Sequence, residues 1–145
     1  MSTYLLDINV LITIHSPAYD GFRAVRQWFL TKGVHSFATC AITEAGFIRI
    51  STQISAKANV GMEEAQIALT ELKKQSGHAF WPMTIGYLEA TQRFSPYPRT
   101  HGQITDAYLL GTAIHHKAKL ATLDRGIVHL AGPKFAEHVE LIPSL

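Results

Sequence analysis

Four acidic side chains carry most of the chemistry that this sequence offers. They are Asp7, Glu44, Asp106 and Asp124. Asp7 follows directly on the apolar residues 4–6, so a buried strand there would deliver one charge to the end of an otherwise apolar sheet. Burying a carboxylate without a partner is costly in free energy. The functional question is therefore whether the other three acids meet Asp7 around a metal ion.

The elements that must position these acids alternate between strands and helices. Apolar runs predict short strands at residues 3–6, 35–39, 80–82, 120–123 and 139–142. Apolar residues at helical spacing, with start and stop signals, predict helices at residues 19–32, 42–50, 61–74, 85–90 and 105–117, and a helical turn that opens at Asp7. This alternation favours parallel strands joined by right-handed crossovers. We expect one α/β domain over residues 1–145.

The predicted topology would gather the four acids at one edge of the sheet. In an open parallel sheet the binding site lies beyond the carboxyl ends of the strands, where helix N-termini also point. Two carboxylates about 4 Å apart repel by roughly 4 kcal/mol at an effective dielectric constant near 20. Four of them would need shared protons or a bound cation. Oxygen ligands without cysteine, and without histidine in register, favour Mg²⁺ or Mn²⁺, which would support phosphodiester hydrolysis.

Each acid also has an interpretation that involves no chemistry. Asp7 and Asp106 stand where aspartate often caps a helix. Glu44 lies in the first turns of a helix, where a solvated glutamate is ordinary, and Asp124 begins the turn-forming sequence Asp-Arg-Gly. Taken singly, each acid fits either interpretation. The joint placement of all four favours the metal site.

Two polar residues stand close enough in sequence to orient these acids. Asn9 lies two residues after Asp7, and Thr122 lies two residues before Asp124. Residues behind the ligands of a metal commonly hold them by hydrogen bonds. A turn amide and a strand threonine are the equally available structural interpretations. We expect Asn9 and Thr122 to support Asp7 and Asp124.

The loop at residues 93–101 combines cations with aromatic rings just before Asp106. Arg93 and Arg99 offer phosphate contacts, while Tyr97 or Phe94 offers a ring on which an unpaired base can stack. We therefore predict RNA binding by Arg93, Tyr97 and Arg99. A proline-stiffened surface loop is the competing interpretation.

The composition points to a covered surface in a cytoplasmic protein. Charged residues make up 17% of the chain, below the typical value of about 25%, and 47% of residues are hydrophobic. Such a surface suggests a partner or a second copy. The net charge of +2 permits nucleic-acid binding without arguing for it. A single cysteine, Cys40, excludes an intrachain disulfide, and we expect neither a signal peptide nor a membrane span.

Four segments resemble the motifs of PIN-domain ribonucleases, in the same order. They are residues 5–11 around Asp7, residues 43–44, residues 105–107 and residues 120–124. The short chain, with residues 46–50 after the glutamate and residues 80–82 before the third motif, is similar to VapC toxins of type II toxin–antitoxin systems. The resemblance covers nearly the whole chain.

This resemblance implies a fold, an activity and partners. The fold would be a three-layer α/β/α sandwich around a parallel sheet, and the activity an Mg²⁺- or Mn²⁺-dependent endoribonuclease acting on structured RNA such as tRNA or rRNA. A cognate VapB antitoxin would inhibit it, and homodimers are common in the family. Asp7, Glu44, Asp106 and Asp124 match the family's acidic positions, of which the one at Asp124 varies most. Asn9 and Thr122 match supporting positions.

Two other classes of function use the same residues. One is a catalytically silent PIN-like module that binds RNA or protein without cutting. The other is a metal phosphohydrolase of small phosphate esters, against which the basic and aromatic loop argues.

Overall fold

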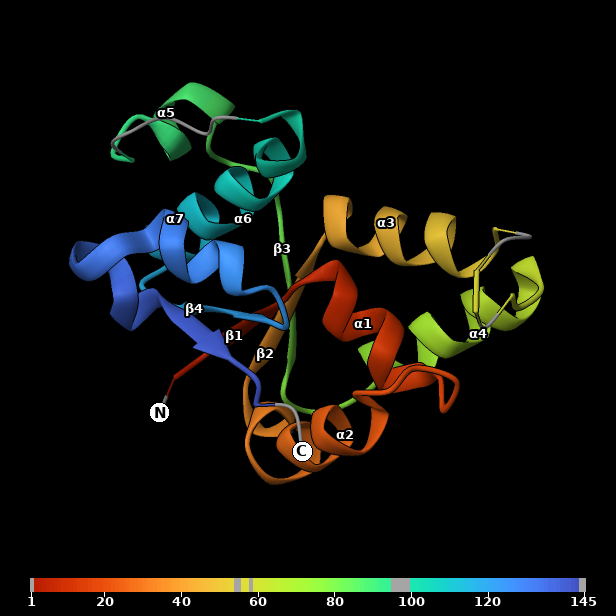
Figure 1. The fold of residues 1–145 in the computed structure, drawn as a ribbon. Coiled ribbons are helices and arrows are strands. Elements are labelled where there is room, and N and C mark those ends of the chain that lie inside the picture. Colours follow the sequence, from red (N-terminus) through yellow and green to blue (C-terminus); the bar gives the residue numbers. More distant parts are fainter. Residues whose placement is uncertain (1, 54–55, 58, 95–99, 144–145) are drawn as a thin grey trace.

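Five parallel strands form the centre of the molecule. The structure is a computed structural model that describes residues 2–53, 56–57, 59–94 and 100–143. Its sheet has the strand order β3-β2-β1-β4-β5, and all neighbouring strands are parallel. The strands are β1 (Tyr4–Leu6), β2 (Phe37–Cys40), β3 (His78–Trp81), β4 (Lys119–Thr122) and β5 (Val139–Leu141). Since β1 is central, its end lies between the ends of β2 and β4 (Figure 1).

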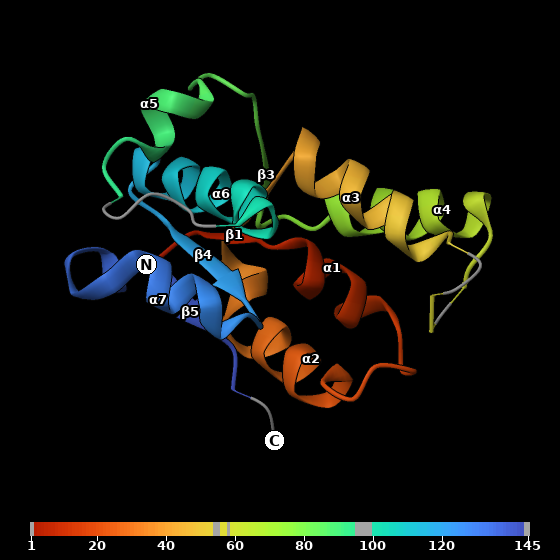
Figure 2. The same cartoon turned by 45° about the horizontal axis from the view of Figure 1, so that its top comes forward.

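Helices cover both faces of this sheet and so complete three layers. The helices are α1 (Ile8–His15), α2 (Phe22–Thr31), α3 (Ala41–Ser51), α4 (Met62–Lys73), α5 (Tyr87–Thr91), α6 (Ile104–His115) and α7 (Arg125–Phe135). Short 3₁₀ helices lie at Gly33–His35, His101–Gln103 and Ala136–His138. The first four helices pack on one face and α6 and α7 on the other, while α5 packs on α6 (Figure 1, Figure 2). This arrangement confirms the predicted α/β/α sandwich.

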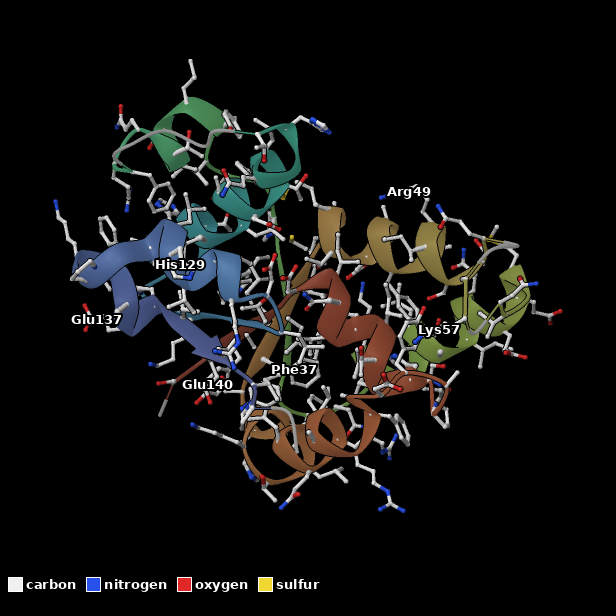
Figure 3. All side chains as sticks on the ribbon, viewed as in Figure 1. Phe37, Arg49, Lys57, His129, Glu137 and Glu140 are labelled. Atoms are coloured by element: carbon white, nitrogen blue, oxygen red, sulfur yellow. The ribbon has the colours of Figure 1, made fainter. Side chains whose placement is uncertain are left out.

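Each face of the sheet has its own apolar core. Tyr4 and Leu6 of β1 pack with α1 to α4, whereas Leu5 between them packs with α6 and α7. A strand buried on both faces is apolar at every position, which explains the unbroken run before Asp7. Phe37 of β2 is fully buried and lies deep in the interior (Figure 3). The two cores fix the strand ends, and therefore the side chains that follow them.

One helix was not predicted. No element is predicted between the fourth and fifth strands, where the structure has α7. Only Ile127 and Ala131 of α7 are buried, and Gly132, at a φ of 63°, interrupts the helical backbone before Pro133. Only seven residues, 125–131, precede the glycine and the proline, which is too short a stretch for its apolar residues to show a helical period. Within the described ranges, no helix has both the length and the apolar character needed to cross a membrane.

Gly111 allows α5 to lie directly on α6. A Cβ atom at position 111 would overlap the backbone carbonyl of Ala90 in α5, and a carbonyl cannot move aside as the end of a long side chain can. We predict that Gly111→Ala lowers the free energy of unfolding by about 1–3 kcal/mol, the usual cost of overpacking. Urea unfolding monitored by circular dichroism measures this change.

The control is Gly61→Ala, since nothing lies within 4 Å of a Cβ placed at Gly61. That variant should unfold within about 0.5 kcal/mol of the parent protein. Equal destabilisation by both substitutions would contradict the close approach of α5 and α6.

Candidate functional site

Asp7 ends β1 and caps α1, and its side chain is held at both oxygens. The backbone N–H of Ile8 donates to Oδ1 at 2.8 Å, and the Thr122 hydroxyl donates to Oδ2 at 2.7 Å. Only 4% of Asp7 is exposed. The Asp7 carboxylate therefore caps α1 and also places a negative charge at the edge of the sheet.

Thr122 and Asn9 tie the end of β4 to the end of β1. The Thr122 hydroxyl donates to Asp7 and accepts from the backbone N–H of Asp124 at 3.1 Å. The side-chain oxygen of Asn9 accepts from the backbone N–H of Leu123 at 3.3 Å. The Thr122 hydroxyl thus contacts both the Asp7 side chain and the Asp124 backbone. The Asn9 side chain holds Leu123, which lies between Thr122 and Asp124.

Three aspartates influence one another at this edge. Burial, together with the charges of Asp7 and Asp124, raises the pKa of Asp106 to about 6. Burial also raises the pKa of Asp7, and the charge of Asp124 adds to that rise, although the Thr122 and Ile8 hydrogen bonds oppose it. Asp106 lies in the first turn of α6, and Asp124 caps α7 by accepting from the N–H of Gly126 at 2.8 Å. From β1 the chain continues to β2 and β3 on one side of the sheet and then to β4 and β5 on the other. Open α/β sheets bind ligands at such a switch point, which lies here between β1 and β4.

Glu44 comes to the same edge but has its own partners. It lies in the first turn of α3, which packs so closely on α1 that a Cβ on Gly46 would overlap the Ile8 side chain. The Lys73 ammonium lies 2.9 Å from Oε2 and 3.1 Å from Oε1 of Glu44, and the Thr39 hydroxyl donates to Oε2 at 2.6 Å. The charge of Glu44 is therefore balanced within the protein, unlike the charges of the three aspartates.

Sequence reasoning missed Lys73, Thr39 and His78, whose Nε2 lies 2.8 Å from the Thr39 hydroxyl. Lys73 appears in the sequence as an ordinary basic residue in the last turn of a helix. Thr39 and His78 appear as strand residues. Only the spacing of five residues between Thr39 and Glu44, across a strand-to-helix turn, offers a sequence signal.

The three aspartates fit a hard divalent cation by donor type and charge. Their oxygens are the ligands that Mg²⁺ and Mn²⁺ prefer. Burial is the largest cause of the raised pKa of Asp106 and of Asp7, and neighbouring carboxylates add to both rises. Among the described residues, no three His, Cys, Asp or Glu side chains converge into a preformed cage.

The predicted RNA-binding loop is corrected in one place. Phe94, proposed as a stacking platform for a base, is 2% exposed and packs edge-to-face on Phe135 with ring centroids 5.7 Å apart. It is a core residue and cannot stack on RNA. Arg93 is half-buried just after α5, whereas Tyr97 and Arg99 lie outside the described residues.

The chain is similar in sequence to one family and to several named relatives. A family model described as PIN domain matches residues 4–133. Ribonuclease VapC38 of Mycobacterium tuberculosis is 31% identical over 142 residues, which are 97% of this chain and 99% of the relative. Ribonuclease VapC29 of the same species is 32% identical over 132 residues, 90% of this chain and 92% of the relative.

Solved structures share the fold. One, titled as the structure of FitAB bound to an IR36 DNA fragment, has a TM-score of 0.63 at 25% identity, covering 88% of this chain and 90% of the other. A toxin–antitoxin complex from Klebsiella pneumoniae has a TM-score of 0.66 at 19% identity, covering 98% and 99% of the two chains. At 19% identity the second likeness concerns the fold alone.

The raised pKa of Asp106 predicts that Asp106→Asn stabilises the metal-free protein. A carboxyl with a raised pKa binds its proton more tightly in the folded state than in the unfolded chain. Stability therefore falls as pH rises from 3.8 to about 6, and the penalty is fully present above that range. We expect the variant to gain about 1 kcal/mol near pH 7.5, a figure reduced for solvent screening of a half-exposed group.

Urea unfolding in the presence of a chelator measures this gain at several pH values. The gain should disappear near pH 4, where Asp106 is protonated in both states. A gain of the same size at every pH would mean that packing, and not charge, is responsible.

Proposed function

The chain belongs to the PIN-domain family, and from this premise we propose that it is the endoribonuclease toxin of a VapBC-type toxin–antitoxin pair. The observation that carries the proposal is the cluster of Asp7, Asp106 and Asp124 at the switch point of the sheet, with the pKa of Asp106 raised to about 6 by burial and by the other two charges. The named ribonuclease relatives, matched over nearly their whole length, support the same activity.

We propose Mg²⁺ or Mn²⁺ as the cofactor, held by Asp7, Asp106 and Asp124 with Glu44 contributing from α3. When bound, one or two such ions supply positive charge for a scissile phosphate and lower the pKa of a water molecule. That chemistry needs no nucleophilic side chain, which agrees with a site built only of carboxylates.

The protein's own residues prepare the site before any ligand arrives. Ile8 N–H and Thr122 fix the Asp7 carboxylate, and Gly126 N–H fixes Oδ1 of Asp124. Asp106, with a pKa of about 6, is protonated in mildly acidic solution and ionised at neutral pH. Cation binding therefore competes with a proton at Asp106 and weakens below about pH 6.

We further propose an RNA substrate, a VapB-type antitoxin, a homodimer and a cytoplasmic location. Arg93 stands next to the segment in which Tyr97 and Arg99 are the other predicted RNA contacts. The relatives named Ribonuclease VapC, at 31% and 32% identity, support a VapB-type antitoxin partner. A charged fraction of only 17% suits a protein whose surface is covered by such partners.

Asp7→Asn is expected to abolish RNA cleavage while preserving the fold. Asparagine caps helices about as well as aspartate, so α1 keeps its cap, but the site loses one anionic ligand. We predict a loss of more than about 100-fold in Mn²⁺-dependent cleavage of total RNA, and the same for Asp106→Asn. Gel analysis of RNA fragments measures the rate, and circular dichroism checks the fold.

Glu137→Gln is the matched control, because its side chain is 80% exposed and lies at the outer edge of the molecule (Figure 3). It should cleave RNA as the parent protein does. Wild-type cleavage by Asp7→Asn would refute the acidic mechanism. If the parent protein binds RNA but does not cleave it, the chain is a catalytically silent module. If the parent protein hydrolyses p-nitrophenyl phosphate but not RNA, it is a phosphatase of small esters.

A further inference from the structure

Of the four acids of the site, Glu44 is the one that forms an ion pair among the described residues. Its carboxylate contacts side chains from two other elements, Thr39 of β2 and Lys73 of α4. The glutamate side chain is only 16% exposed, and Thr39 is fully buried. Such a carboxylate does not sample many rotamers, because leaving this position would leave buried donors unpaired.

The hydrogen bonds around Thr39 have one consistent direction. A threonine hydroxyl has a single proton, and the 2.6 Å contact with ionised Glu44 requires that the hydroxyl donates it to Oε2. The 2.8 Å contact with Nε2 of His78 must then run the other way, from ring to hydroxyl. His78 therefore carries a proton on Nε2, and a relay leads from His78 through Thr39 to Glu44.

This relay makes the two oxygens of Glu44 unequal. Oε2 accepts from Thr39 and lies 2.9 Å from the Lys73 ammonium, so its acceptor capacity is filled. Oε1 has Lys73 at 3.1 Å and retains capacity for another donor or for a cation. The contacts with Thr39 and Lys73 therefore leave Oε1 as the oxygen of Glu44 with acceptor capacity to spare.

We propose that Thr39 and His78 are positioning residues of the nuclease site, which orient Glu44 so that Oε1 is the oxygen available for a cation or its water. This inference rests on the proposed function, since it assigns a use to Glu44 within that site. Lys73 balances the charge of Glu44, which leaves the three aspartates as the part of the site that requires an added cation.

The first test compares Thr39→Val, which removes the hydroxyl while keeping the branched shape, with Thr39→Ser, which keeps the hydroxyl. For Thr39→Val we expect kcat for RNA cleavage to fall about 10- to 100-fold with little change in KM. We also expect the Kd for Mn²⁺, measured by calorimetry without RNA, to rise about 10-fold. Thr39→Ser should restore both values to within about threefold of the parent.

The other end of the relay offers an independent pair. His78→Leu has no donor and should behave as Thr39→Val does, whereas His78→Gln retains an N–H that can donate to Thr39 and should keep part of the activity. This pair keeps the proposal falsifiable if a substitution at the buried Thr39 disturbs folding. Wild-type Mn²⁺ affinity and kcat in His78→Leu would overturn the relay.

A double-mutant cycle separates positioning from simple packing. If Thr39 acts through Glu44, Thr39→Val should cause no further loss of Mn²⁺ affinity or kcat in a Glu44→Gln background. If it acts only on packing, the two losses should multiply, and the proposal is wrong. Multiplying losses would contradict the positioning role of Thr39 alone. Failure of the proposed function would appear instead as full RNA cleavage by Asp7→Asn.

Discussion

Repulsion among carboxylates at the end of β1 is the constraint around which the rest of this molecule is arranged. Asp7 is buried, the charge of Asp124 adds to the rise in its pKa, and the charges of Asp7 and Asp124 both raise the pKa of Asp106. Among the described residues no cationic side chain forms an ion pair with these aspartates, and apolar packing on both faces of the sheet holds the strand ends that carry Asp7 and Asp124. The hydrogen bonds from Ile8 and Thr122 hold Asp7 in place against the repulsion.

The acids are divided between two electrostatic environments. Glu44 has a lysine and a hydroxyl beside it and is balanced without any ligand. The three aspartates have each other, and for them a divalent cation is the natural counter-charge. The site therefore has one carboxylate whose charge is balanced within the protein and three whose charges form no ion pair among the described residues.

Much of the fold and of the acidic edge was predictable because both depend on local patterns. Apolar runs marked the five strands, and parallel strands necessarily bring residues after β1 and β4 to one edge. The partners of Glu44 were not predictable, since its contact with Lys73, and the contact of Thr39 with His78, follow from how α3, α4, β2 and β3 pack. Phe94 was predicted to stack on RNA because it stands in a polar loop. It is buried instead and packs against Phe135, a contact that the sequence does not indicate.

The hydrogen bond between Thr122 and Asp7 joins residues 115 positions apart in the chain. During synthesis, the first strand and its aspartate therefore exist long before the hydroxyl and the other two aspartates that complete the cluster. Contacts of such long range require closure of a long loop, which slows folding. A growing or prematurely ended chain lacks Thr122 and Asp124, so the acidic edge cannot assemble until most of the polypeptide has been made.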